Sequence, residues 1–277
     1  MPELPEIETI CLDLQKKIIN TTITKTIVRQ KSLRWPINPK LPKILINYKI
    51  LAIKRRAKYL LISCYNKKLN KHGTLIIHLG MSGKLIITEQ VNTFKKHDHV
   101  DFILDNNIIL RYNDPRRFGA ILWTNKDPLT HKLLINLGAE PLDLRVNANY
   151  LLNKALNKNL SIKKFIMHNK IIVGIGNIYA NEALFAAKIH PNTMAKKLDL
   201  NQMNKLLMAI RNILNIAIQQ GGTTLKDFFS PNGQTGKFVN ELKVYGKNKQ
   251  ACLECNTIIN QLILGQRSTF YCPKCQI

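Results

Sequence analysis

The first nineteen residues have the spacing of an amphipathic helix. Apolar side chains recur there every three or four positions: Ile7, Ile10, Cys11, Leu14 and Ile18. This stripe predicts a helix over residues 3–19 with one buried face. Pro2 and Pro5 suit its first turn, where a missing N–H costs no hydrogen bond.

From about residue 22 to residue 125 the pattern changes to short apolar runs of the β type. Seven runs are predicted strands: Ile44–Ile53, Tyr59–Cys64, Thr74–His78, Lys84–Thr88, His99–Leu104, Ile108–Tyr112 and Ala120–Trp123. Turn residues such as Asn106–Asn107 and Gly83 separate them. Many short strands at this spacing predict an antiparallel sandwich or barrel.

Helical periodicity returns beyond Pro128 and Pro141. Four further helices are predicted: Asn147–Asn157, Ile162–His168, Asn177–Lys188 and Asp199–Gln220. The last begins with Asp199 and Gln202, which resemble a capping box, and Gly221–Gly222 should end it. The Gly/Ser/Thr-rich residues 223–243 predict a flexible loop.

The charge balance of the chain points to a polyanionic partner. The 277 residues include 42 Lys+Arg against 17 Asp+Glu, a net charge of +25. Such a surface attracts nucleic acid by counterion release. Only ten of the basic residues are arginines, and Asn, Ile and Lys are abundant throughout. Part of the charge therefore fits a compositional drift of AT-rich coding, and both interpretations stay open.

Other classes of protein fit the sequence poorly. No apolar run approaches the roughly 20 residues that cross a bilayer. The segment Met1–Glu8 holds three glutamates and no basic residue, so a signal peptide is not expected. Six cysteines are too few for a secreted disulfide scaffold of this length. We expect a cytoplasmic protein without membrane attachment.

The last residues carry a metal-type cysteine pattern. Cys252 and Cys255 form one CxxC pair, and Cys272 and Cys275 form a second after sixteen residues. This spacing predicts one structural zinc ion, because four thiolates fill its tetrahedral shell. The alternative is a pair of disulfides. Thr257–Leu264 and Ser268–Tyr271 should form a hairpin, with Arg267 at its tip.

The amino end offers an unusual nucleophile. Removal of Met1, which a small second residue permits, would leave Pro2 with a secondary amine. Its condensation with an aldehyde carbon gives an iminium that has no N–H proton to lose, which makes it a good electron sink for β-elimination. Glu3 beside it could move protons. The plainer interpretation is that this segment is simply a well-formed helix start.

Further clusters are individually modest. Lys58 stands at a strand start, and two glycine-bearing loops present Met81, Arg116 and Phe118. Such side chains can wedge into a base stack once a base is extruded, although core and turn roles are commoner. Gly174-Ile-Gly176-Asn177 precedes a helix and could bind phosphate through backbone N–H groups.

Together these segments resemble the formamidopyrimidine-DNA glycosylase family, bifunctional enzymes that remove oxidised purines such as 8-oxoguanine. The resemblance spans nearly the whole chain in eight segments: MPELPEIET, RRAKYL, HLGMSG, KHDHVD, DPRRFG, GIGNIYANE, VYG and QRSTFYCPKCQ. It implies an α+β multidomain fold in four parts. These are an N-terminal β-sandwich catalytic domain with its helix (1–130), a helix-two-turns-helix DNA-binding domain (131–222), a lesion-recognition loop and linker (223–243), and a C-terminal zinc finger (244–277).

The resemblance also assigns roles. Pro2 would attack the sugar C1′ as Schiff-base nucleophile, and Glu3 would donate protons in base release. Lys58 would contact phosphate near the lesion and donate a proton in β-elimination. Arg267 would grip the flanking phosphates and assist δ-elimination. DNA-contacting positions would be the void-filling Met81, Arg116 and Phe118, the lesion-pocket residue Glu6, and the backbone contacts His97, Lys158, Lys163 and Asn177.

The implied partner is duplex DNA with oxidised purines or abasic sites, bound by a monomer at the nucleoid in base excision repair. His168 and Asn169 depart from the family pattern, and residues 223–240 are too divergent for contacts to be assigned.

One alternative is an endonuclease VIII-type glycosylase for oxidised pyrimidines, which typically has Gly where this chain has Leu4. The other is a non-catalytic nucleic-acid-binding zinc protein, which would need neither Pro2 nor Glu3.

Overall fold

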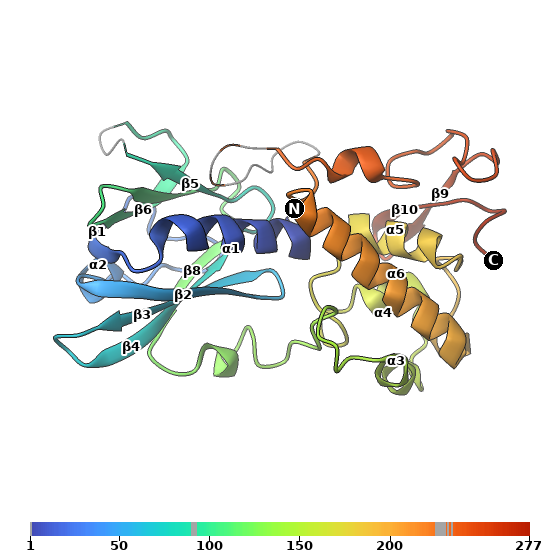
Figure 1. Ribbon diagram of the computed structural model, residues 1–277, viewed down its shortest axis with the longest axis horizontal. Coiled ribbons are helices and arrows are strands. Elements are labelled where there is room, and N and C mark those ends of the chain that lie inside the picture. The colour runs from blue at the N-terminus through green and yellow to red at the C-terminus, as the bar shows by residue number, and fades with distance from the viewer. Residues whose placement is uncertain (1, 90–92, 225–230, 232, 234) are drawn as a thin grey trace. The chain divides into compact units, whose positions relative to one another are not determined.

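The computed structural model describes residues 2–89, 93–224, 231, 233 and 235–277 (Figure 1). The chain forms two compact units. One comprises Met1–Ile135 with Gln220–Lys237, and the other comprises Asn136–Gln219 with Phe238–Ile277. No helix in these described ranges is long and apolar enough to span a membrane.

The first unit combines one long helix with a large antiparallel sheet. Helix α1 spans Leu4–Ile18, and its buried face carries the predicted apolar stripe. Among the described residues, eight strands pair in the order β5-β7-β6-β1-β2-β3-β4-β8. Their bounds are β1 Thr22–Val28, β2 Tyr48–Arg56, β3 Tyr59–Asn66, β4 Lys71–His78, β5 Lys84–Thr88, β6 Asp98–Leu104, β7 Ile109–Asn113 and β8 Ala120–Thr124.

The sheet divides into two layers at its centre. β1 pairs with β2 only through Thr22 and Ile23, and then continues alongside β6. In the view of Figure 1, β5 and β6 lie on one side of α1, and β3 and β4 lie on the other. Apolar side chains of α1 and of both strand groups share one core. The predicted β-sandwich is therefore confirmed.

Two details of the strand prediction were wrong. β1 was missed because its sequence alternates Thr and Lys with apolar residues, and only Ile23 and Thr26 are buried. The predicted strand Ile44–Ile53 begins too early, because Leu41–Ile44 forms a short helix, α2. Pro42 occupies the first turn of that helix, where proline is well tolerated.

The second unit contains the helices predicted beyond Pro141. They are α3 Ala148–Ala155, α4 Ile162–Ile166, α5 Asn177–Ala186 and α6 Leu200–Gln219. Single 3₁₀ turns occur in this unit at Ala195–Lys197 and Phe238–Glu241, and in the first unit at Pro128–Thr130. The capping box of α6 is confirmed: Asp199 Oδ1 accepts from the Gln202 N–H at 2.7 Å, and Gln202 Oε1 accepts from the Asp199 N–H at 3.0 Å.

The cysteine-rich end of this unit is a hairpin, as predicted, but its bounds differ from the prediction. β9 spans Asn260–Leu264, which starts later than Thr257, and β10 spans Arg267–Tyr271, so Arg267 begins a strand and Gly265 and Gln266 form the tip. The predicted loop 223–243 is described only in part, because residues 225–230, 232 and 234 lie outside the described residues. The described remainder includes the 3₁₀ turn Phe238–Glu241.

Candidate active site

The start of α1 holds two carboxylates in the interior of the first unit. Pro2 is buried and Glu3 is 3% exposed. The Glu3 backbone N–H donates to Glu6 Oε2 at 2.7 Å, and Glu6 Oε1 accepts from the Thr223 N–H at 2.7 Å. The positive end of the helix dipole favours negative charge at this place. Glu6 thus fixes the helix start, which carries the predicted nucleophile and proton donor, to the segment after α6.

Lys58 lies in a two-residue turn between β2 and β3. Arg56 pairs with Tyr59 across that turn, and Ala57 adopts a left-handed φ of 53°. The Arg55 guanidinium donates to the Ala57 carbonyl at 3.2 Å and to Glu8 Oε2 on α1 at 2.6 Å. Arg55 therefore connects the turn that holds Lys58 to helix α1, which directly follows Pro2 and Glu3. Arg55 was not singled out from the sequence, because its partners Glu8 and Ala57 are known only from the fold.

The three predicted wedge residues lie together in one groove. Met81 and Phe118 are 40% and 45% exposed, which is high for such apolar side chains. The Arg116 guanidinium lies over the Phe118 ring at 4.7 Å from its centroid. All three line a groove of about 750 Å³, together with Arg34 and His78. Exposed apolar and cationic tips suit insertion into a base stack.

Asp114 organises the two loops that carry these residues, and sequence reasoning missed it. Its carboxylate is fully buried and accepts three hydrogen bonds, from Ser82 Oγ at 2.8 Å, the Gly119 N–H at 2.9 Å and the Tyr112 hydroxyl at 3.2 Å. Ser82 Oγ also accepts from the Arg116 N–H at 3.2 Å. The Met81 loop and the Phe118 loop are thereby held by one buried anion.

Two glycines let these loops approach each other. A Cβ on Gly80 would lie 2.5 Å from the backbone carbon of Phe118, and one on Gly119 would lie 2.5 Å from the His78 carbonyl oxygen. No side chain fits at such distances. Their presence in the sequence was visible, but the backbone approach that requires them was not.

His78 is a neutral hydrogen-bond acceptor at the edge of this groove. Its Nδ1 accepts from the Gly80 N–H at 3.0 Å, which requires an unprotonated nitrogen. Burial, assisted by the nearby positive charges of Lys58 and Arg34, lowers the pKa of His78 to about 4.

Two predicted DNA contacts have accessible side chains. His97 is partly exposed just before β6, and Lys158 is exposed between α3 and α4. Asn177 begins α5, and its Nδ2 donates to the Ser268 carbonyl at 3.0 Å.

Lys163 is placed differently from the other predicted DNA contacts. It is 1% exposed, and its Nζ donates to Thr269 Oγ1 at 2.7 Å and to the Ser268 carbonyl at 3.0 Å. Its ammonium is thus directed at the zinc hairpin within the protein, which argues against a direct phosphate contact.

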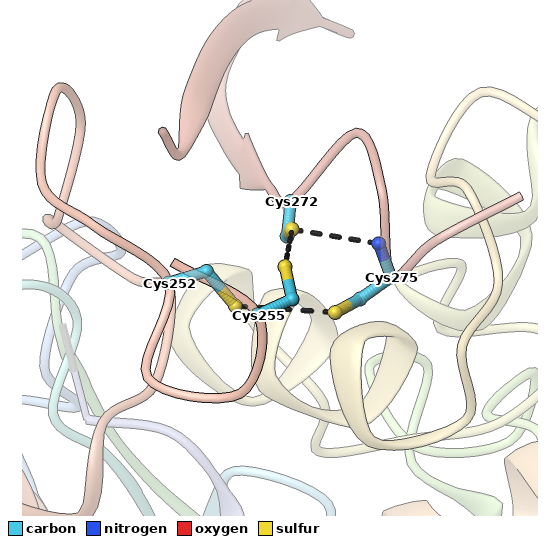
Figure 2. Close-up of side chains that lie close together, drawn as sticks. All are labelled: Cys252, Cys255, Cys272 and Cys275. Carbon is cyan, nitrogen blue, oxygen red and sulfur yellow. Dashed lines mark hydrogen bonds between the residues drawn. The ribbon is translucent and has the colours of Figure 1, made fainter. Parts of the chain in front are cut away.

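The four predicted zinc ligands converge at the base of this hairpin (Figure 2). Their sulfur atoms all lie within 4.8 Å of one another, with Cys255 and Cys272 at 3.4 Å and Cys252 and Cys275 at 4.0 Å. Tetrahedral zinc with bonds of about 2.3 Å separates its sulfurs by about 3.8 Å, so the cluster fits the ion. The structure describes all six cysteines, and none of them is in a disulfide bond.

Comparisons with known proteins match each part of the chain. Three family models match: the formamidopyrimidine-DNA glycosylase N-terminal domain over residues 1–121, the H2TH domain of that glycosylase over residues 137–229, and a zinc finger found in FPG and IleRS over residues 249–277. A catalytic sandwich, an H2TH domain and a structural zinc finger together define a class of DNA glycosylases.

Relatives of known name extend this match to the full length. The formamidopyrimidine-DNA glycosylases of Haemophilus influenzae and Hydrogenovibrio crunogenus are 49% and 48% identical, covering 100% of this chain and 99% and 96% of theirs. A Lactococcus lactis FPG mutant in complex with a Fapy-dG containing DNA has a TM-score of 0.90 at 31% identity, with 99% of each chain covered. MutM (FPG) from Thermus thermophilus has a TM-score of 0.86 at 28% identity, covering 99% of this chain and 98% of that one. The chain therefore belongs to the formamidopyrimidine-DNA glycosylase family, and its zinc is structural.

Proposed function

We propose that this enzyme is a bifunctional DNA glycosylase and AP lyase that excises oxidised purines from duplex DNA in base excision repair. The observation that carries the proposal is the full-length match to named glycosylases, combined with Pro2 and Glu3 at a buried helix start. The solved structures similar to this chain include a Lactococcus lactis FPG mutant with a Fapy-dG containing DNA and Lactococcus lactis Fpg with an abasic site containing DNA. Both kinds of DNA are proposed substrates here.

The proposed chemistry begins with the Pro2 nitrogen after removal of Met1. This nitrogen forms a bond to C1′ of the damaged nucleotide while the bond from C1′ to the base breaks, and Glu3 supplies protons for base release and ring opening. A general base takes the C2′ proton, and the electrons of that C–H bond pass to the iminium and give an enamine. The enamine returns to an iminium as the C3′–O bond breaks and the 3′-phosphate leaves, and a second elimination breaks the C5′–O bond and releases the 5′-phosphate. Lys58 and Arg267 would bind phosphates near the lesion and assist the two eliminations.

Met81, Arg116 and Phe118 would fill the space left by the extruded base. An oxidised base stacks or pairs less well, which lowers the extrusion cost of a few kcal/mol. His97, Lys158 and Asn177 would contact the DNA backbone. We further propose a monomeric enzyme that works in the cytoplasm at the nucleoid, where this substrate is found.

Borohydride trapping with intact-mass analysis tests the proposal. The wild type, with Met1 removed, should be captured on DNA that holds 8-oxoguanine opposite cytosine. Pro2→Gly should slow capture at least about a hundredfold, because a primary amine replaces the ring nitrogen. Glu3→Gln should block excision and leave DNA affinity within about twofold.

Three outcomes would overturn parts of the proposal. Capture on thymine glycol DNA in preference to 8-oxoguanine DNA would indicate an endonuclease VIII-type enzyme, which Leu4 argues against. Absence of any adduct would indicate a non-catalytic binding protein. An active wild type that retains Met1 would remove Pro2 as the nucleophile.

A further inference from the structure

The strand that carries Arg267 is held by side chains from two helices of the same unit. Lys163 on α4 binds the Ser268 carbonyl and Thr269 Oγ1 at 3.0 and 2.7 Å. Asn181 on α5 accepts from the Phe270 N–H through its Oδ1 at 2.8 Å. Three consecutive residues of β10 are thus bonded to helices, immediately after Arg267.

The two helix side chains and Thr269 are buried, whereas Ser268 is exposed. Lys163 and Asn181 are each 1% exposed, and Thr269 is 0% exposed. Removing an ammonium group from water costs several kcal/mol, and a well-packed apolar side chain would often be at least as stable. The lysine is therefore better explained by the geometry that it imposes on β10 than by a gain in stability.

The hairpin turn fixes the backbone position of Arg267 relative to the bonded residues of β10. Gly265 and Gln266 have φ of 58° and 60°, and Arg267 pairs with Leu264. Two central residues with positive φ define a type I′ turn, which fixes the register of the hairpin. Because the bonded residues begin at Ser268, a displacement of β10 would displace the Arg267 backbone directly.

We propose that Lys163 and Asn181 form a clamp, named here the hairpin clamp, that positions Arg267 for its phosphate contact. Lys163 is then a positioning residue that acts through Arg267. This inference rests on the role of Arg267 in the proposed function.

The test removes the clamp without changing its shape. Lys163→Met keeps the length of the side chain, and Thr269→Val keeps the shape of its partner. Lys205→Met is the matched control, because it makes the same change at an exposed residue of α6 in the same unit. Zinc content and circular dichroism verify the fold, and Asn181→Ala tests the second bond independently.

Two readouts are expected to change together. The first readout is amide hydrogen exchange in the protein without DNA. In Lys163→Met, exchange across residues 267–271 should accelerate about tenfold, and in Asn181→Ala the same acceleration should occur at the Phe270 amide. Strand cleavage on abasic DNA should fall at least about tenfold in Lys163→Met and Thr269→Val. In an Arg267→Ala background, the same substitutions should change cleavage less than about twofold.

The opposing outcomes are distinct. If the penalties of Lys163→Met and Arg267→Ala are additive, Lys163 contacts DNA by itself and the clamp is refuted. Unchanged exchange and unchanged cleavage in Lys163→Met and Thr269→Val would refute it as well. If the wild type shows no borohydride capture, the proposed function fails. Accelerated hydrogen exchange in Lys163→Met would still show that the clamp holds β10.

Discussion

At the scale of single residues, Asp114 determines how the groove is presented. Its substitution by Ala leaves the Ser82 hydroxyl and the Gly119 N–H without an acceptor, whereas the Tyr112 hydroxyl still has the His78 carbonyl at 3.3 Å. We expect a loss of about 3 kcal/mol in the free energy of unfolding, because each unsatisfied buried donor costs about 1–3 kcal/mol and these partly relax. Urea unfolding measures it. The control Asp105→Ala, at an exposed position, should stay within about 0.5 kcal/mol, and equal losses in both variants would contradict the role.

His78 should make the stability of the free protein depend on pH. Its pKa is about 4 in the folded protein, from burial and from Lys58 and Arg34, against 6.5 in an unfolded chain. Between these values the unfolded state binds more protons, so the free energy of unfolding rises with pH from 4 to 6.5. The full contribution is present above pH 6.5, and it is at most about 3 kcal/mol.

Unfolding of His78→Gln at a series of pH values checks this. The variant should lose that part of the pH dependence, whereas His72→Gln, at an exposed residue, should retain it. A wild-type curve that matches that of His78→Gln between pH 4 and 6.5 would exclude the protonation effect.

At the scale of elements, the sequence predicted what local spacing determines. The two CxxC pairs, the stripe of α1 and the capping box of α6 depend on neighbours within a few residues or one hairpin. The partners of buried polar groups could not be predicted in this way. Glu6 binds Thr223 from 217 positions away, and Lys163 binds Thr269 from 106 positions away. Both are residues for which the sequence predicted DNA contacts and gave no sign of these bonds inside the protein.

The zinc hairpin should depend on its metal as one element. Structural zinc supplies folding energy that a hairpin of this size lacks, and Cys252 also packs with Phe185 and Ile259 in a small core. Cys252→Ser should therefore release the zinc and weaken DNA binding at least about tenfold. Metal analysis and DNA titration measure both. Cys64→Ala, in the core of the first unit, should leave the metal content unchanged. Retention of one zinc by Cys252→Ser would refute the ligand set.

At the scale of the whole molecule, the charge of +25 need not all serve DNA binding. Lys67 and Lys68 follow the end of β3, whereas Lys58 directly precedes its start. Eight residues of strand at about 3.3 Å each separate them by about 26 Å. The Lys67–Lys68 turn is thus remote from the proposed site. Substituting these two lysines therefore tests whether lysines far from the site contribute to DNA binding or reflect coding drift.

The salt dependence of DNA affinity separates the two interpretations. Each lysine that neutralises a phosphate contributes about 0.9 to the slope of log affinity against log salt concentration. Lys158→Gln should reduce the magnitude of that slope by about 1, because Lys158 is exposed at a proposed backbone contact. The double variant Lys67→Gln, Lys68→Gln loses twice the charge and should leave the slope unchanged, since a charge beyond the Debye length of about 10 Å at 0.1 M salt acts weakly. A reduction of about 2 in the double variant would mean that this distant turn also contacts DNA and that its lysines are functional.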